Sequence, residues 1–189
     1  MLAPSLLTFL KLVHAWNAKI DLTGARTPAA LADVMLADGL VMAEPAIVPG
    51  GAHLLDVGAG AGGPAIPLAL ARPDVRVTML EPLGKRVAFL RTVIGTLGLA
   101  SRVSAVLGRI DPAFPAFDGA APDIACARAT FAPTEWLSIG LALAPRVIVL
   151  TTPGDVPDGA TCTLVHRHDY RWPGSGAPRA IARFDRAGR

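Results

Sequence analysis

The residues with the clearest chemical potential are an acid and a set of small residues directly behind it. The acid is Asp56, which lies within the apolar run that begins at Leu54. The small residues that follow it are Gly58, Ala59, Gly60 and Gly62. Glycines at this spacing let a backbone turn tightly and approach a ligand closely. Because Gly63 also completes the dinucleotide pattern GxGxxG, the glycines alone leave two nucleotide cofactors open.

Three acids decide between these cofactors. Asp56 stands where a dinucleotide-binding strand usually has an apolar residue; a carboxylate there repels a pyrophosphate but suits a cationic sulfonium and ammonium. Glu81 ends the next expected strand, about twenty residues beyond Gly58, where it can bind both hydroxyls of a ribose. Asp111 follows the third expected strand and can accept from an adenine amino group. This combination predicts S-adenosylmethionine, with a nicotinamide oxidoreductase as the less favoured alternative.

Basic side chains are expected at the same edge. Lys85 and Arg86 open a helix, where the helix dipole disfavours cations by about 0.3–1 kcal/mol each, which suggests a partner such as phosphate. Solvated side chains that lean away from the helix start are the alternative. Arg109 and Arg128 each follow an expected strand. A guanidinium can contact a guanine edge or a phosphate, and we expect Arg128 to orient the acceptor. Structural salt bridges are the alternative for both arginines.

Short apolar strands alternate with helices from residue 53 onward. The expected strands are 54–57, 75–81, 102–108, 123–127 and 146–152, and helices are expected to begin at 64, 84 and 133. This alternation predicts a doubly wound, Rossmann-like α/β sheet with its ligand loops along one edge. Two later strand-like runs, 160–168 and 178–185, have no helix between them and are expected to pair antiparallel.

Two helices are expected ahead of the sheet. The first spans residues 4–20, with apolar side chains on one face, and the second begins at Pro28, is capped by Thr27 and runs to about Ala43. We therefore divide the chain into an N-terminal helical appendage, residues 1–48, and one compact cofactor-binding domain, residues 49–189.

Composition narrows the class of protein. The chain has 189 residues, about one domain, and just over half of them are apolar. Its two cysteines, Cys126 and Cys162, lie far apart and indicate neither a disulfide framework nor a zinc site. The N-terminus lacks the basic region of a secretory signal, and no apolar run is long enough to span a membrane. We expect a cytoplasmic monomer without a metal, in which His166 and His168 share one side of a strand as surface residues.

The charge is uneven along the chain. Arginine supplies 15 of the 18 basic residues, and residues 161–189 carry six Arg against two Asp, a net charge of +4. Such a basic tail is compatible with a nucleic-acid partner, and solvated arginines on edge strands are the alternative.

Several longer stretches resemble one known family. They are "WNAKIDLT" (16–23), "LLDVGAGAGGPAIPLALARP" (54–73) and "EPLGKRVAFL" (81–90), together with "GRI" around Arg109 and "ARA" around Arg128. The sequence is similar to the glucose-inhibited division protein B family, the bacterial 16S ribosomal RNA guanine-N7 methyltransferases. The resemblance implies a Rossmann-like methyltransferase fold and S-adenosylmethionine as donor, with Arg109 and Ile110 among its contacts. It also implies a guanine of the small ribosomal subunit as acceptor.

The sequence departs from that family at positions implied to line the RNA site. Val34 and Met35 stand where the family usually carries Arg-His ahead of Asp38, and Thr152 replaces a lysine. Two alternatives therefore stay open: a diverged relative that methylates another RNA or a small molecule, and a non-catalytic binding module. We hypothesise that basic residues of the tail replace the missing contacts; these are Arg167, Arg171 and Arg179.

Overall fold

The protein is built on one seven-stranded sheet with the strand order β3-β2-β1-β4-β5-β7-β6. The computed structural model describes residues 2–113, 115–159 and 162–187. The strands are β1 (His53–Val57), β2 (Arg76–Glu81), β3 (Val103–Leu107), β4 (Ile124–Arg128), β5 (Arg146–Thr151), β6 (Cys162–Arg171) and β7 (Pro178–Arg186). Strands β1 to β5 are parallel, and β7 runs antiparallel to both β5 and β6. The predicted doubly wound sheet and antiparallel tail are confirmed.

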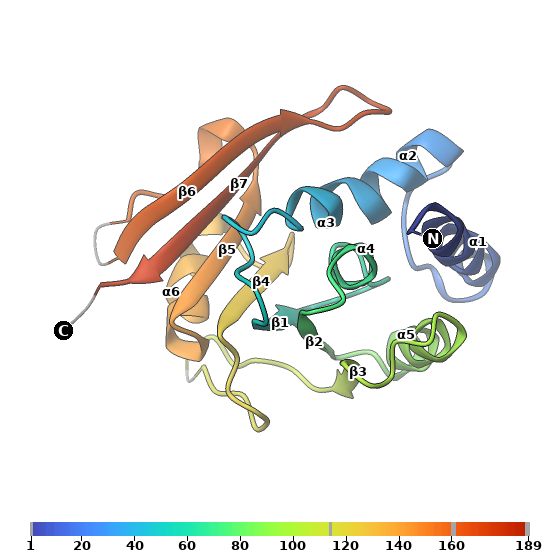
Figure 1. Ribbon diagram of the computed structural model, residues 1–189, viewed down its shortest axis with the longest axis horizontal. Coiled ribbons are helices and arrows are strands. Elements are labelled where there is room, and N and C mark those ends of the chain that lie inside the picture. Colours follow the sequence, from blue (N-terminus) through green and yellow to red (C-terminus); the bar gives the residue numbers. More distant parts are fainter. Residues whose placement is uncertain (1, 114, 160–161, 188–189) are drawn as a thin grey trace.

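Helices cover both faces of this sheet (Figure 1). They are α1 (Leu2–Ile20), α2 (Pro28–Ala32), a π-helical segment (Asp33–Ala37), α3 (Asp38–Val41), α4 (Ala65–Ala71), α5 (Gly84–Thr96), α6 (Pro133–Leu143) and a 3₁₀ turn (Pro153–Asp155). Helix α6 covers one face, while α4 and α5 cover the other and α1 packs across both of them. None of the helices in the described ranges is both long and apolar enough to cross a bilayer.

The second expected helix exists, but its middle is a π-helical turn. Thr27 caps its start as predicted, because its hydroxyl accepts from the Ala30 N–H at 3.1 Å. The π-helical segment begins at Asp33 and ends just before Asp38, so the two acids are separated by five residues, the span of one π-helical hydrogen bond. Both side chains contact the β6–β7 hairpin, which Figure 1 shows reaching over α2. The sequence pattern did not distinguish this turn from α-helix.

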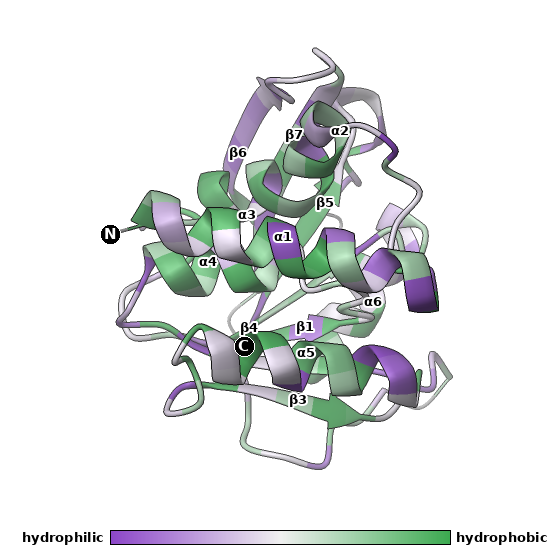
Figure 2. Cartoon of the chain, turned by 90° about the vertical axis from the view of Figure 1, so that its right-hand side faces the viewer, coloured by the Kyte–Doolittle hydropathy of each residue, from purple (hydrophilic) through white to green (hydrophobic). Residues whose placement is uncertain are grey.

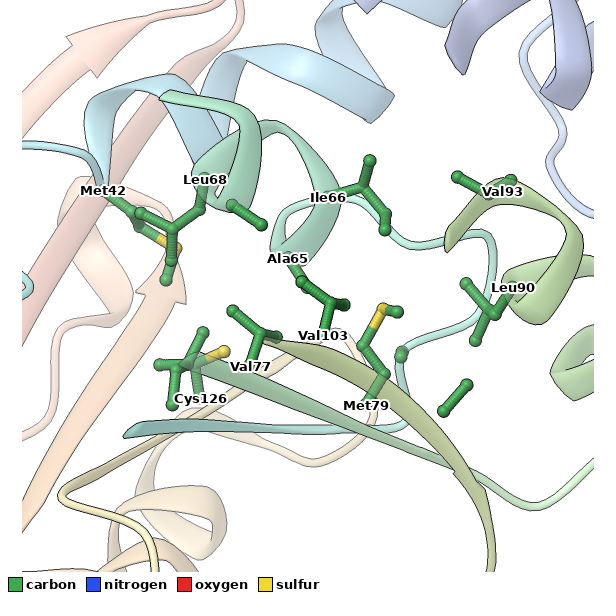
Figure 3. Packing of buried hydrophobic residues seen from close by; sticks show 14 of the residues in the cluster. Met42, Ala65, Ile66, Leu68, Val77, Met79, Leu90, Val93, Val103 and Cys126 are labelled. Carbon is green, nitrogen blue, oxygen red and sulfur yellow. The ribbon is translucent and has the colours of Figure 1, made fainter. Parts of the chain in front are cut away.

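Apolar side chains fill a layer on each face of the sheet. In the layer shown in Figure 3, Ile66 and Leu68 of α4 pack with Met79 of β2 and Leu90 of α5. On the opposite face Trp136 is buried, and its Nε1–H donates to the Ile148 carbonyl at 2.8 Å. Burying each large apolar side chain contributes about 1.5–3 kcal/mol, so both layers hold the strand ends in fixed positions.

The N-terminal helix is locked onto the sheet by the "WNAKIDLT" stretch. The Trp16 ring lies 5.5 Å from the Phe89 ring of α5. The Asn17 side chain accepts from the N–H groups of Leu22 and Thr23 at 2.7 and 2.8 Å. These contacts give both residues a structural role and fix the loop that follows α1.

The sheet ends in a polar strand. Figure 2 shows β5 in hydrophobic colours and β6 mostly in hydrophilic ones. In β6 the exposed residues alternate with half-buried ones from His166 onward. A polar edge strand is poorly suited to pairing with another sheet. The half-buried side chains of β6 face the rest of the molecule and can contact it.

Candidate functional site

The glycine loop after β1 requires glycine at its first position. Gly58 has φ +77°, and a Cβ there would lie 2.9 Å from Cγ2 of Thr130, which follows β4. Gly60 also has positive φ, at +56°. Side chains rarely adopt such backbone angles, so the loop is selected for its shape and for close approach to its surroundings.

Glu81, the last residue of β2, connects the glycine loop with the loop that follows β2. Its carboxylate is 2 % exposed and accepts from the Gly60 N–H at 2.9 Å and from the Leu83 N–H at 3.0 Å. Each carboxylate oxygen can accept more than one hydrogen bond, so both keep the capacity to accept from ligand hydroxyls. The hydrogen bonds from the two backbone N–H groups fix the orientation of the Glu81 carboxylate toward such a ligand.

A cavity of about 410 Å³ opens beside Glu81. Its volume lies within the range of pockets that bind small molecules. Its walls come from the ends of β1, β2, β3 and β4 and include Val57, Gly58, Glu81, Leu83, Arg86, Arg109, Ile110, Thr130 and Phe131. Ile110 is buried and Arg109 is exposed, so the wall is apolar within and cationic at its mouth.

Asp56 lies beneath the glycine loop and carries an unpaired oxygen. The residue is 1 % exposed, and the Cys126 thiol lies 3.5 Å from its Oδ1. Its Oδ2 has no hydrogen-bond partner within the described part of the chain. Burial raises the pKa of Asp56 to about 7, against the opposing effect of the Arg128 charge. A cation placed near this buried carboxylate would stabilise its charged form and lower its pKa.

This raised pKa predicts the pH dependence of stability. The folded chain holds the Asp56 proton up to about pH 7, whereas the unfolded chain releases it near 3.8, the ordinary pKa of an aspartate. Stability is therefore lost as pH rises between these values. Asp56→Asn cannot ionise and therefore does not lose this stability. The free energy of unfolding of the variant, relative to that of the wild type, should increase by about 2–3 kcal/mol from pH 5 to pH 8.

Urea denaturation at both pH values measures this difference. Asp118→Asn is the matched control, because it removes a carboxylate from an exposed loop. If both variants change with pH in parallel, the buried charge does not have the predicted effect.

A second hollow of about 400 Å³ adjoins the first. The two share Gly58, Arg86 and Thr130. The second lies between the glycine loop, the π-helical segment and the hairpin, and its walls include Val34, Met35, Ala59, Gly60, Arg128, Trp172 and Arg179. Three guanidinium groups therefore border this second hollow: Arg86, which it shares with the cavity, Arg128 and Arg179.

Asp38 holds these cations in place. It is 1 % exposed and accepts from the Trp172 Nε1–H at 2.6 Å and from the Tyr170 hydroxyl. Its Oδ2 lies 3.3 Å from Nη1 of Arg128 and 3.9 Å from Nη2 of Arg179. Arg128 also donates to the Val34 carbonyl, and the Arg179 guanidinium lies 4.7 Å from the centre of the Trp172 ring. The burial of Tyr170 and the charge of Asp38 raise the pKa of the Tyr170 phenol.

The structure brings most of the predicted site residues to this edge, but not all of them. Asp56 is buried beneath the loop and lines neither hollow. Gly62 (φ +86°) does not line either hollow, and a Cβ there would lie 2.8 Å from Cγ1 of Ile66. Lys85 is exposed and lines neither hollow, while Arg86 borders both and donates to the Asp21 carbonyl at 3.3 Å. Asp111 is exposed outside both linings, where its Oδ1 accepts from the Ala113 N–H.

Sequence reasoning missed several residues that line the hollows. Thr130 and Phe131 follow β4, so the rule that ligands meet strand ends could have named them. Trp172 carried no comparable signal, because only the tertiary contact between the hairpin and Asp38 brings it to the site.

Comparison with known proteins identifies the family. The family described as GidB, rRNA small subunit methyltransferase G, matches residues 3–151. The ribosomal RNA small subunit methyltransferase G of Anaeromyxobacter dehalogenans strain 2CP-C is 37 % identical over 182 residues, 91 % of this chain and 83 % of the relative. The protein of that name from Anaeromyxobacter sp. strain Fw109-5 is 34 % identical over 191 residues, 96 % of this chain and 87 % of the relative.

The chain belongs to the rRNA small subunit methyltransferase G family. It is thus an S-adenosylmethionine-dependent methyltransferase, and the suspected resemblance is confirmed.

Solved structures agree on the Rossmann-like fold of this methyltransferase. TrmN from Thermus thermophilus has a TM-score of 0.58 at 19 % identity, covering 84 % of this chain and 49 % of that one. The putative RNA methyltransferase PH1948 from Pyrococcus horikoshii has a TM-score of 0.58 at 15 % identity, covering 94 % and 98 %. At these identities the likeness concerns the fold.

The residues of this methyltransferase fit S-adenosylmethionine. The unpaired Oδ2 of Asp56 suits the cationic part of the cofactor, and Glu81 presents a fixed carboxylate for ribose hydroxyls. A Cβ at Gly58 would collide with Thr130, a residue that lines both hollows. When bound, the cofactor supplies an electrophilic methyl group.

Proposed function

We propose that the protein transfers a methyl group from S-adenosylmethionine to N7 of a guanine in 16S ribosomal RNA of the small subunit. The observation that carries this proposal is the meeting of two hollows at Gly58, Arg86 and Thr130. One hollow is lined by Glu81, a carboxylate of the kind that binds ribose hydroxyls, and the other is bordered by the guanidinium groups of Arg86, Arg128 and Arg179. Methyl transfer is an in-line displacement, so holding donor and acceptor side by side supplies most of its catalysis.

On the cofactor side, Glu81 binds and orients the ribose, and the glycine loop admits only a ligand that fits closely against its backbone. The backbone of Gly58, Ala59 and Gly60 provides close approach, while Arg109 and Ile110 cover the far wall of the cavity. Asp56 lies below the loop, where a bound cation would favour its charged form. Gly62 supports the loop by packing against α4. Asp111 and Lys85 are exposed and line neither hollow, so they would reach a bound ligand only from the solvent side.

On the acceptor side, Arg128 is the residue that orients the base or its phosphate. Its guanidinium is held by Val34 and Asp38, so it presents a fixed donor set to the hollow. Guanine N7 has a free lone pair at neutral pH and needs no general base, which agrees with a site built for positioning. Val34 and Met35 leave this wall without the family's Arg-His pair, and Arg179 supplies a cation from the hairpin instead.

Labelled methyl transfer to small subunits that lack the modification tests the proposal. We expect incorporation into one guanine, recovered as 7-methylguanosine, with Asp56→Ala as the inactive control. Naked 16S RNA and a total RNA pool are assayed in parallel. Incorporation only into another RNA would favour a diverged substrate, for which the loss of the Arg-His pair is the supporting observation. Cofactor binding without any transfer would overturn the proposed activity.

Single substitutions distinguish the contribution of Arg179 to RNA binding from those of the other hairpin arginines. Arg179→Gln should raise the KM for the RNA substrate about tenfold, the loss of one charge-assisted contact, and leave cofactor affinity unchanged. Arg171→Gln is the matched control, since Arg171 is exposed and donates to the Gly176 carbonyl. Arg167 likewise pairs with Asp169 on the exposed face, 2.8 Å away. Equal effects of Arg179→Gln and Arg171→Gln would assign the tail a diffuse electrostatic role.

Two further properties belong to the proposal. We place the protein in the cytoplasm, because both cysteines are free thiols and one of them is buried. The hollows are complete within one chain, which supports a monomer as the active form.

A further inference from the structure

We propose that Glu44, His166 and His168 form a divalent metal site of the kind that binds Zn²⁺, separate from the methyl-transfer site. One oxygen and two ring nitrogens, one donor atom from each residue, lie within 4.8 Å of one another. Nδ1 of His168 is 3.6 Å from Oε1 of Glu44. Two imidazoles and a carboxylate are a ligand set that zinc uses in proteins with three side-chain ligands.

The fold places these donors on one side of the hairpin. His166 and His168 are two residues apart on β6, opposite Arg183 and Ile181 of β7, and the register shifts between Leu164 and His166. Both rings therefore point to the half-buried face of the strand. Glu44 follows α3, where its carbonyl accepts from the N–H groups of the turn behind it at 2.9 and 3.0 Å. Its backbone is thus anchored against the same face.

An unpaired nitrogen points to a ligand. Nε2 of His166 is buried and has no hydrogen-bond partner in the described ranges. A buried polar atom without a partner is unfavourable because it has lost its hydrogen bonds to water, and a coordinated metal ion removes that cost. His168 is also oriented, since its ring meets the Tyr170 ring edge-on at 5.8 Å.

The spacing needs little adjustment. In a tetrahedral zinc site with bonds of about 2.0–2.2 Å, neighbouring ligand atoms lie roughly 3.3–3.6 Å apart. Nδ1 of His168 and Oε1 of Glu44 already have this separation. The other donor atoms lie at most 4.8 Å apart, so side-chain rotation has to bring them closer by no more than about 1 Å. Glu44 and His168 are partly exposed, so the fourth position faces solvent and suits a water molecule.

The charges around the cluster do not oppose a cation. Arg183 lies opposite His166, but its Nη1 donates to the Ala46 carbonyl at 2.7 Å and its Nε lies 3.2 Å from Oδ1 of Asp185. Its charge is therefore compensated by Asp185, while Glu44 contributes negative charge directly to the cluster.

The site would connect the turn after α3 to β6. That connection would hold the hairpin whose far end carries Trp172 and Arg179 into the acceptor hollow. The role is structural, because N7 methylation needs no metal. The sequence alone predicted no metal here, since the two histidines lacked a third ligand until the fold brought Glu44 beside them.

Titration calorimetry with Zn²⁺, on the full chain freed of any affinity tag, tests the site. We expect one ion per chain, saturation below about 100 µM metal and a higher Tm with Zn²⁺ present. His168→Gln and Glu44→Gln should each weaken binding at least about tenfold, since losing even a supporting partner of a ligand costs about 10- to 100-fold. His14→Gln, an exposed histidine of α1, is the matched control and should bind as the wild type does.

Three results would overturn the proposal. They are the absence of saturable binding in the wild type, unchanged binding in both ligand variants, and a Co²⁺ spectrum with the strong thiolate band of a cysteine ligand. Circular dichroism checks that each variant is folded. Because the Glu44 side chain is 46 % exposed, Glu44→Gln gives a reading even where a histidine variant does not fold.

Discussion

Gly58→Ala is expected to weaken S-adenosylmethionine binding about 100-fold or more, which corresponds to at least ~2.7 kcal/mol. The backbone at Gly58 has φ +77°, where a side chain costs about 1–2 kcal/mol. The added Cβ would also collide with Thr130, whose Oγ1 lies 3.3 Å from the Val57 carbonyl. Because Thr130 borders both hollows, relief of the collision displaces a wall of each. Titration calorimetry with the cofactor measures the loss, and the Tm measures the strain.

Two variants separate strain from collision. Gly84→Ala is the control, because nothing lies within 4 Å of a Cβ at that position. The double variant Gly58→Ala, Thr130→Ala removes the collision and keeps the unfavourable φ, so we expect partial recovery of cofactor affinity. Wild-type affinity in Gly58→Ala alone would show that the loop does not approach the cofactor.

The sheet was predictable because its determinants are local. Each parallel strand is a short apolar run bounded by turn residues, and the alternation with helices leaves one arrangement of the connections. The cofactor edge followed from this, since Asp56, Gly58 and Glu81 are all placed by strand ends. Helix α6 (Pro133–Leu143) begins at the predicted residue, because Pro133 is favoured in the first turn of a helix.

The acceptor side was less predictable because its contacts join distant segments. The apolar spacing of residues 28–43 indicates a helix but does not distinguish a π-turn within it. That turn begins at Asp33 and ends just before Asp38; Asp33 accepts from the N–H groups of Gly174 and Ser175 at 2.8 Å each. The hairpin is thus positioned by buried carboxylates whose partners lie more than a hundred residues away. Spacing within one segment contains no information on such pairs.

Asp38→Ala is expected to lower the free energy of unfolding by about 3–5 kcal/mol, the usual cost of removing one partner from a buried ion pair. Asp38 is the common acceptor of Tyr170, Trp172 and Arg128 and also lies near Arg179. Its removal leaves two guanidinium groups close together without their counterion. Urea denaturation at pH 7 measures the loss, and Asp38→Asn, which keeps the shape without the charge, should lie between the wild type and Asp38→Ala.

Asp169→Ala provides the matched control on the exposed side of the same hairpin. Asp169 pairs with Arg167 at 2.8 Å, but both side chains are exposed and screened by solvent, so its removal should leave the free energy of unfolding close to that of the wild type. Asp38→Ala should also lower methyl transfer more than cofactor affinity, because Arg128 and Arg179 lose the group that orients them. A cost as small as that of Asp169→Ala would mean that the hairpin is held by its strand pairing with β5 alone. In that case the buried carboxylate would orient the cations without stabilising the fold.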